Sequence, residues 1–453
     1  MTIVVSAMRI PSILNPHSSF LIPPSSNLIP QTSNLSMPKP SSFSTYHKII
    51  IFLLALTQFT IVLDFMVMSP LGDFLIKAMH ISPGQFGIAV SAYAFSAGIS
   101  GLLAAGFADR YDRKKLLLFF YSGFILGTLA CGLATTYPFL IFARILTGLF
   151  GGVMGSVLMA IIGDVFKPEL RGRVMGFIQM GFAASSVLGI PVGIYLANIW
   201  DWHAPFLMIV GLALLIFILV YRFMEPVVHH LSQNQKTTAL NHFRNVLAHP
   251  PYQLAFLATA LLSIGGFLMM PFGSAFAINN LKISPDQLPI LYMATGIASL
   301  VIMPLVGRLS DRTNRFKIFL FGSVWASIFI VIYTNLPVVP LWAVIVLNIL
   351  LFAGIMSRMI PASTIMISLP RLHDRGAFMS ISSSLQQIAG GIAAAFAGLI
   401  VTQKTPNSPI EHYPTLGFIS VAVMMLCAYL IYKVYLMTRQ ASKEGVSQAK
   451  IEQ

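Results

Sequence analysis

Twelve long apolar segments constrain the fold of this chain more than any other feature of its sequence. Each is close to the roughly 20 residues that a helix needs to cross about 30 Å of hydrocarbon. A helix satisfies its own backbone hydrogen bonds, which lipid cannot do, whereas barrel strands are about half as long. We therefore predict an all-α membrane protein with twelve transmembrane helices. The predicted spans are residues 49–71, 84–107, 115–134, 138–164, 172–197, 203–223, 252–278, 287–307, 317–335, 339–368, 376–402 and 414–437.

The composition supports a lipid environment. Apolar residues make up 56% of the 453 positions and charged residues only 9%, against about 25% in a soluble domain. The net charge of +14 could suggest nucleic acid, but the basic residues form short clusters between apolar segments, as topology signals do. We expect the lipid bilayer and no nucleic acid among the partners. Cys131 and Cys427 both lie in apolar segments, so no disulfide framework is expected.

The positions of lysine and arginine predict the orientation. If the N-terminus is cytoplasmic, 23 of the 28 basic residues lie inside and only Lys77, Lys282 and Lys404 lie outside. This bias predicts that both termini are cytoplasmic. We expect a multi-pass protein of the cell membrane, which in a bacterium is the inner membrane.

An internal repeat divides the chain into two copies. Four short patterns recur at an offset of 202 or 204 residues, in register with one another. An even number of helices separates the copies, so both have the same orientation, giving two parallel six-helix repeats. The repeated pairs are residues 81–85 with 283–287, residues 109–113 with 311–315, Pro138 with Pro340, and Arg171-Gly172 with Arg375-Gly376. Ser82 and Ser284 are predicted to cap helix starts before Pro83 and Pro285.

The segments between and beyond the spans set the predicted domain boundaries. Residues 1–47 contain seven prolines, eleven serines and no acid, which favours a disordered cytoplasmic tail. A start of translation at Met37 and a targeting peptide are the alternatives. The predicted parts are a tail at 1–47, a six-helix bundle at 48–223, a cytoplasmic linker at 224–250, a six-helix bundle at 251–437 and a cytoplasmic tail at 438–453.

Four motifs resemble a known family. Residues 106–115 resemble the loop between helices 2 and 3 of the major facilitator superfamily, and residues 307–315 resemble its counterpart between helices 8 and 9. Residues 144–148 resemble the fourth-helix motif of proton-coupled members. Gly189, Pro191 and Gly193 resemble the fifth-helix motif of drug:proton antiporters, in the form found in arabinose-efflux-like permeases.

The resemblance implies that the two loops form a conformational latch. The negative charge of Asp109 would interact favourably with the positive N-terminus of a helix in the other half. Arg113 would pair with Asp164. Asn314 stands where the family has glycine and suits a left-handed turn. The alternative is a charged topology loop with solvated acids. The residues assigned to the latch are Asp109, Arg110, Arg113, Asp164, Asp311, Arg312 and Arg315.

Three charged residues lie well inside predicted spans, away from their ends, where ionisable groups are functional-site candidates. Asp64 is about fifteen residues, roughly 22 Å, from the inner face, and Arg144 is about six residues, roughly 9 Å, from the outer face. Their depths nearly coincide, and the resemblance puts the first and fourth helices together. The pair could exchange a proton for a salt bridge as access alternates, or it could be a static brace.

Arg358 could bind an anionic substrate group or pair with another residue. Asn348, Gln386 and Gln387 are polar residues within spans that could contact substrate or join helices. No nucleotide-binding loop, metal-ligand spacing or His-Asp pattern is evident. We therefore expect no enzyme activity, no cofactor and no metal.

The resemblance implies a monomeric secondary transporter that exports a small organic solute in exchange for protons. A proton symporter that imports a sugar or an organic acid is the alternative. A receptor or scaffold built on a transporter fold is a more remote one.

The charge count makes a direct prediction of topology. A reporter fused at residue 240 should be cytoplasmic and one fused at residue 407 should be external, because 23 basic residues favour the inner side against three on the outer side. Reporter enzymes active on only one side of the membrane measure this. A reversed result at either site contradicts the twelve-helix topology.

Overall fold

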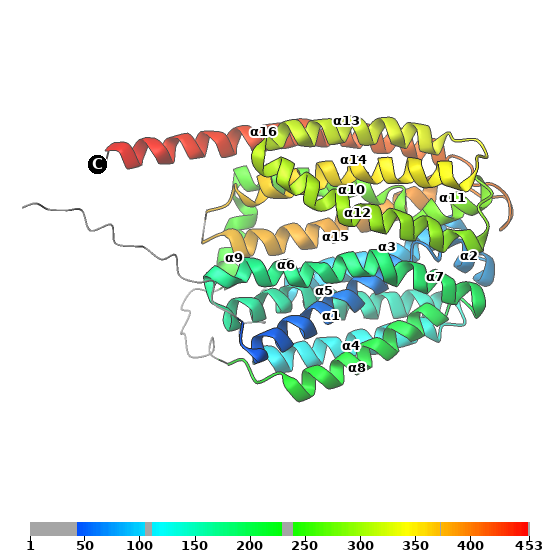
Figure 1. Cartoon of the computed structure of the whole chain (residues 1–453), viewed down its shortest axis with the longest axis horizontal. Helices are drawn as coiled ribbons and strands as arrows, with labels where there is room; N and C mark the ends of the chain where they lie inside the picture. Colours follow the sequence, from blue (N-terminus) through cyan, green and yellow to red (C-terminus); the bar gives the residue numbers. More distant parts are fainter. Residues whose placement is uncertain (1–42, 105–110, 229–238, 372, 452–453) are drawn as a thin grey trace, which may run out of the picture. The chain divides into compact units, whose positions relative to one another are not determined.

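A computed structural model describes residues 43–104, 111–228, 239–371 and 373–451. Its elements belong to one compact unit that starts at Thr45 (Figure 1). The helices are α1 Thr45–Val67, α2 Gly72–Met79, α3 Pro83–Ala104, α4 Arg113–Gly132, α5 Tyr137–Val165, α6 Pro168–Ala184, the π-helix η2 Ser185–Gly189, α7 Ile190–Ile199, α8 Ala204–Phe223, α9 Ala239–Ala248, α10 Pro250–Phe267, the 3-10 helix η4 Met270–Phe272, α11 Gly273–Asn279, the 3-10 helix η5 Pro285–Gln287, α12 Leu288–Arg312, α13 Arg315–Thr334, α14 Leu341–Ile367, α15 Arg375–Ile400 and α16 Tyr413–Ile451.

Within the described residues, twelve helical segments are long and apolar enough to cross a membrane, as the sequence predicts. Two of them are not the unbroken spans that were expected. The fifth consists of α6, η2 and α7, and the seventh consists of α10, η4 and α11. The prediction also ran the first span to residue 71, whereas α1 ends at Val67 and is followed by the separate helix α2.

Helix caps occupy matching positions in the two repeats. Ser82 accepts from the backbone N–H of Gln85 at 3.2 Å, and Ser284 forms the same kind of capping box, which confirms both predicted helix starts. Asp112 caps α4 and Asn314 caps α13, each accepting from the backbone N–H two residues later. The expectation of a left-handed turn at Asn314 is wrong, because its φ is −64° and its side chain serves as the cap.

Two corrections concern the segments outside the bundles. The predicted linker at 224–250 contains helix α9, and α16 continues through the predicted tail as far as Ile451 (Figure 1). Asp109 and Arg110 of the proposed latch lie outside the described residues.

The N-terminal half (α1–α8) and the C-terminal half (α10–α16) pack along two seams. Helix α3 lies along α15, and α12 lies against η2 and α7. The first seam depends on small residues, because a side chain at Gly87 would place its Cβ only 2.7 Å from the carbonyl oxygen of Ala394. Close backbone approach therefore holds the two halves together at this seam.

We call the end of the bundle that carries α2 and α11 the outer end, since the charge count predicts it to be external. Five side-chain hydrogen bonds join described residues of the two halves, and all lie at this end or in the half of the bundle next to it. They run from Ser69 to the Met270 carbonyl, from Ser274 to the Ser69 carbonyl, from Asn279 to Asp73, from Asn198 to the Pro285 carbonyl and from Ser91 to the Gly391 carbonyl. The outer end is closed in this structure.

The contact between Asp73 and Asn279 makes a testable contribution to this closure. Asp73 is buried and accepts from the Asn279 amide and from Lys77, at 2.7 Å. A hydrogen bond to a charged group contributes about 1.5–3 kcal/mol. Asn279→Ala should therefore raise the ratio of outer-open to outer-closed protein about 10- to 150-fold.

Spin labels at the exposed residues Trp200 and Val338, one in each half, report the opening as a longer distance. Asn335→Ala is the matched control, because that amide bonds to Val331 and Thr334 of the neighbouring helix α13, within its own half. An unchanged distance distribution in Asn279→Ala would show that this contact does not hold the outer end closed.

Candidate functional site

A buried ion pair joins α1 to α5 in the N-terminal half. Nη1 of Arg144 donates to Oδ2 of Asp64 at 3.0 Å. Both side chains are almost completely buried, at 1% and 0% exposure. The contact predicted from their matching depths is therefore confirmed; its role in transport stays a prediction. Charges in such surroundings are costly unless they are paired and hydrogen-bonded.

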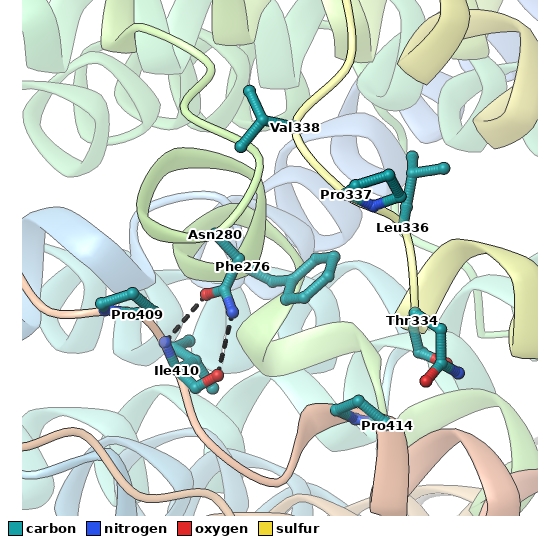
Figure 2. Close-up of a pocket in the computed structure, with 10 residues that line it drawn as sticks. Phe276, Asn280, Thr334, Leu336, Pro337, Val338, Pro409, Ile410 and Pro414 are labelled. Atoms are coloured by element: carbon teal, nitrogen blue, oxygen red, sulfur yellow. Dashed lines mark hydrogen bonds between the residues drawn. The ribbon is translucent and has the colours of Figure 1, made fainter.

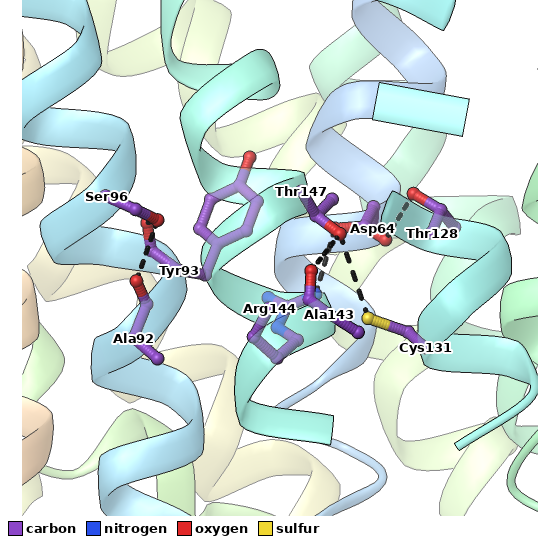
Figure 3. A network of polar contacts seen from close by, with 9 residues as sticks. All are labelled: Asp64, Ala92, Tyr93, Ser96, Thr128, Cys131, Ala143, Arg144 and Thr147. Atoms are coloured by element: carbon purple, nitrogen blue, oxygen red, sulfur yellow. Dashed lines mark hydrogen bonds and ion pairs between the residues drawn. The ribbon is translucent and has the colours of Figure 1, made fainter. Parts of the chain in front are cut away.

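Two further helices complete the surroundings of the pair (Figure 3). Thr128 of α4 donates to Oδ1 of Asp64 at 3.1 Å, so both carboxylate oxygens have a donor. Cζ of Arg144 lies 4.6 Å from the centre of the Tyr93 ring of α3. Nε of Arg144 has no hydrogen-bond partner within the described chain. The guanidinium thus contacts both Asp64 and the Tyr93 ring, and its Nε is left as a donor for another group.

The sequence motif at residues 144–148 explains how α5 holds this site. Thr147 bonds back to the Ala143 carbonyl at 2.8 Å and lies 3.8 Å from the Cys131 sulfur. Gly148 allows α3 to approach, because a Cβ there would be 2.4 Å from the Tyr93 carbonyl oxygen. The motif therefore supplies the cation and also the close packing that puts Tyr93 beside it.

The fifth-helix motif packs on α1 around Asp64. Pro191 lacks the N–H that an unbroken helix would use, and it is the second residue after the π-helix η2. A Cβ at Gly189 would be 2.6 Å from the Leu63 side chain, and one at Gly193 would be 3.0 Å from Val67. The motif thus packs on α1 both before and after Asp64.

Two routes connect the pair to the C-terminal half. The first runs through Phe65, whose ring centre is 5.4 Å from that of Tyr93 and 5.8 Å from that of Phe267 on α10. The second runs through η2, whose backbone at Ser186 meets α12, since a Cβ at Gly296 would be 2.9 Å from the Ser186 carbonyl oxygen. A movement of one half relative to the other would therefore change the packing of Leu63 and Phe65, the residues before and after Asp64.

Arg358 on α14 is a buried cation of the C-terminal half. It is 1% exposed, and its Nε and Nη2 have no hydrogen-bond partner within the described residues. Its Nη1 lies 3.6 Å from a Cβ placed at Gly265 of α10, and Cys427 of α16 is its neighbour. None of the ion pairs among described residues includes Arg358. The sequence analysis left open that Arg358 pairs with another residue, and the described residues supply no acid for this.

The three amides proposed for the cavity are available for contact. Asn348 on α14 and Gln386 and Gln387 on α15 are half-buried, and none has a side-chain hydrogen bond to another described residue. The structure does not bring them into contact with the Asp64–Arg144 pair, because that cluster consists of α1, α3, α4 and α5 residues.

The proposed latch is formed only in part. Arg113 pairs with Asp164 at 2.9 Å, as expected, but both belong to the N-terminal half, so this pair does not by itself join the halves. Asp112 accepts from the backbone N–H groups of Lys114 and Val227, which gives that charge a structural role. In the second loop, Asp311, Arg312 and Arg315 form no ion pair with described residues.

The larger of two described pockets is separate from this site. It has a volume of about 440 Å³ and lies at the outer end of the C-terminal half (Figure 2). Asn280, which follows α11, and Ile410 exchange two hydrogen bonds in its wall, at 2.8 and 2.9 Å. Its lining comes from one half alone, so it does not have the position of a site between two rocking halves.

Comparison with known proteins identifies the family. The sequence pattern of the Major Facilitator Superfamily matches residues 54–394 and 255–451, and the chain belongs to this family. It is a secondary transporter of this superfamily and not an enzyme.

The relatives are distant. An uncharacterized MFS-type transporter of Bacillus subtilis, YceJ, is 25% identical over 62% of this chain and 71% of its own. A protein named probable sugar efflux transporter in Helicobacter pylori is 24% identical over 75% of this chain and 85% of its own. Among solved structures, a D-xylose-proton symporter aligns over 87% of this chain and 99% of its own, with a TM-score of 0.70 and 17% identity. A bacterial homologue of the lysosomal transporter Spinster, titled inward-facing, aligns over 89% and 98% with a TM-score of 0.66 and 16% identity.

Sequence reasoning missed several members of the site. Thr128 and Tyr93 carry no charge and no motif marks them, so only their contacts reveal them. Asp73 and Asn279 were also missed, although their spacing of 206 residues is close to the repeat offset and was an available signal.

Arg358 provides a test of whether a buried charge is kept for function. A buried ion without a partner carries a desolvation penalty, which an apolar side chain of similar length does not. Replacing buried ionic groups with apolar ones has raised stability by about 1–4 kcal/mol in related cases. We predict that Arg358→Met raises the melting temperature of the purified protein and reduces transport. Arg375→Met, at an exposed arginine, is the control. A lower melting temperature for Arg358→Met would mean that the cation stabilises the bundle.

Proposed function

We propose that this transporter couples the entry of protons to the export of a small organic solute, and that Asp64 carries the proton. The observation that carries the proposal is the Asp64–Arg144 ion pair, a titratable acid at 0% exposure within a span. Two further observations support export: the fifth-helix motif packed against Leu63, and the relatives named probable sugar efflux transporters.

The state of the structure fits one step of such a cycle. The outer end is closed and the ion pair is formed, as expected after Asp64 has released its proton to the inner side. When the outer end opens, a proton that binds the Asp64 carboxylate neutralises it and frees Arg144. Release of that proton on the inner side restores the charge and the 3.0 Å contact.

Contacts next to Asp64 provide the physical link between protonation and access. Phe65 follows Asp64 in the chain and touches Phe267 of the other half, while Leu63 precedes it and packs on Gly189. A change in the ion pair therefore alters the residues that pack on both sides. Each ligand shifts the balance of states by its differential affinity for them.

The decisive experiment uses Asp64→Asn in reconstituted liposomes. Asparagine keeps the size and the hydrogen bond with Thr128, but it carries no proton to release. We expect the variant to fold and to exchange substrate across the membrane, and to lose accumulation driven by a pH gradient. The readouts are the proton flux triggered by substrate and the direction of substrate movement under imposed gradients of either sign.

Asp286→Asn, at an exposed acid, is the matched control and should behave as the wild type. Arg144→Ala should cost more stability than Asp64→Asn, about 3–5 kcal/mol, because it leaves a buried carboxylate without its cation. Substrate-coupled proton flux at the wild-type ratio in Asp64→Asn would place coupling elsewhere and leave the pair as a brace.

A further inference from the structure

Three potential metal ligands meet at the inner end of the C-terminal half. His242 comes from helix α9, and His373 and Asp374 come from the turn before α15. One donor atom from each lies within 4.8 Å of the other two. The two histidines are more than a hundred residues apart along the chain, so no motif spacing reveals the cluster.

The distances between the donor atoms are close to those that a zinc ion requires. Nδ1 of His373 is 3.2 Å and Nε2 of His242 is 3.7 Å from the same carboxylate oxygen, Oδ1 of Asp374. A tetrahedral ion with bonds of about 2.0–2.2 Å separates its ligands by about 3.4 Å. The two imidazole rings, with centres 4.6 Å apart, are already on the same side of the carboxylate.

The carboxylate is held by a second residue. Oδ2 of Asp374 accepts from the Tyr252 hydroxyl at 2.9 Å, and that hydroxyl accepts from the backbone N–H of Arg371 at 3.2 Å. This leaves Oδ1 directed to the histidines. Partners of this kind orient metal ligands and affect metal affinity. The arrangement is therefore more than a chance meeting of surface side chains.

A small cavity beside the cluster holds another donor. Its volume is about 160 Å³, and its wall includes all three residues together with His249 and Tyr252. Nδ1 of His249 is buried and has no hydrogen-bond partner within the described part of the chain, while its ring stacks on Tyr252 at 4.3 Å. An orphaned buried nitrogen in the wall of the same cavity is a second, independent sign of a missing ligand.

We propose that His242, His373 and Asp374 bind a divalent transition-metal ion of the zinc type. Two imidazoles and one carboxylate suit such an ion and are a poor set for Mg²⁺ or Ca²⁺, which prefer oxygen ligands. The fourth position is open to water. The His373 side chain is 74% exposed, so the ion can reach the site from solvent.

The bound ion would clamp helix α9 to the start of α15. Helix α9 precedes α10 directly, and α15 packs along α3 of the other half. A metal link at this point would therefore fix the position of α9 against a helix of the seam between the halves. The site lies apart from Asp64 and Arg144, so its test is independent of proton coupling.

The experiment measures Zn²⁺ binding to the purified full chain, with any affinity tag removed, by calorimetry and by thermal shift. We expect stoichiometric binding and a higher melting temperature with Zn²⁺, and no shift with Mg²⁺ or Ca²⁺. His242→Ala and His373→Ala should each weaken Zn²⁺ binding at least about tenfold, and Tyr252→Phe about tenfold. Co²⁺ in place of Zn²⁺ should give the visible absorption of a tetrahedral site.

Arg244→Ala, at an exposed residue of the same helix α9, is the matched control and should bind Zn²⁺ as the wild type does. Because the His373 side chain is highly exposed, we expect His373→Ala to fold normally. A melting temperature equal to that of the wild type in the absence of metal verifies this, so that lost Zn²⁺ binding can be assigned to the lost ligand. Absence of Zn²⁺ binding, or equal binding by wild type and both histidine variants, would overturn the proposal.

Discussion

The ion pair between Asp64 and Arg144 is the interaction on which the N-terminal half depends. Taking two ions out of water costs several kcal/mol each, and their attraction offsets this only with good geometry and further hydrogen bonds. The surrounding helices meet those conditions: Thr128 serves the second carboxylate oxygen and Tyr93 faces the guanidinium. The close packing of α3 on α5 at Gly148 follows from the same need, because it seals the pair from water.

The two halves share a repeat but not the same chemistry. At the outer end, Ser69 and Ser274 each bond across to the other half, and Asp73 meets Asn279. An acid in place of Asn279 would repel Asp73, whereas the amide donates a hydrogen bond to it. The intramembrane charges differ in the same way, since the N-terminal half buries a pair and the C-terminal half buries Arg358 without an acid.

A conformational cycle needs contacts that can be exchanged, and the structure gathers them in one part of the bundle. The described hydrogen bonds between the halves lie in its outer part, and the ion pair lies in the same part, against Tyr93 of α3. The neighbours of Asp64 contact both the fifth-helix motif and Phe267. Charge at one buried acid is thereby connected to the packing of two helical bundles, which is the requirement for coupling a proton to alternating access.

The sequence by itself determined the twelve spans, the duplication, the helix caps at Ser82 and Ser284, and the pairing of Asp64 with Arg144. The spans, the duplication and the caps follow from apolar length and from a fixed offset, which can be counted along a chain. The pairing follows from depth together with the family resemblance, which puts the first and fourth helices together. Only the tertiary structure decided which face of each helix meets its neighbour, because rotation about a helix axis in lipid leaves little trace in composition. Thr128, Tyr93 and the His242–His373–Asp374 cluster are defined by such lateral contacts, so they emerge only once the helices are packed.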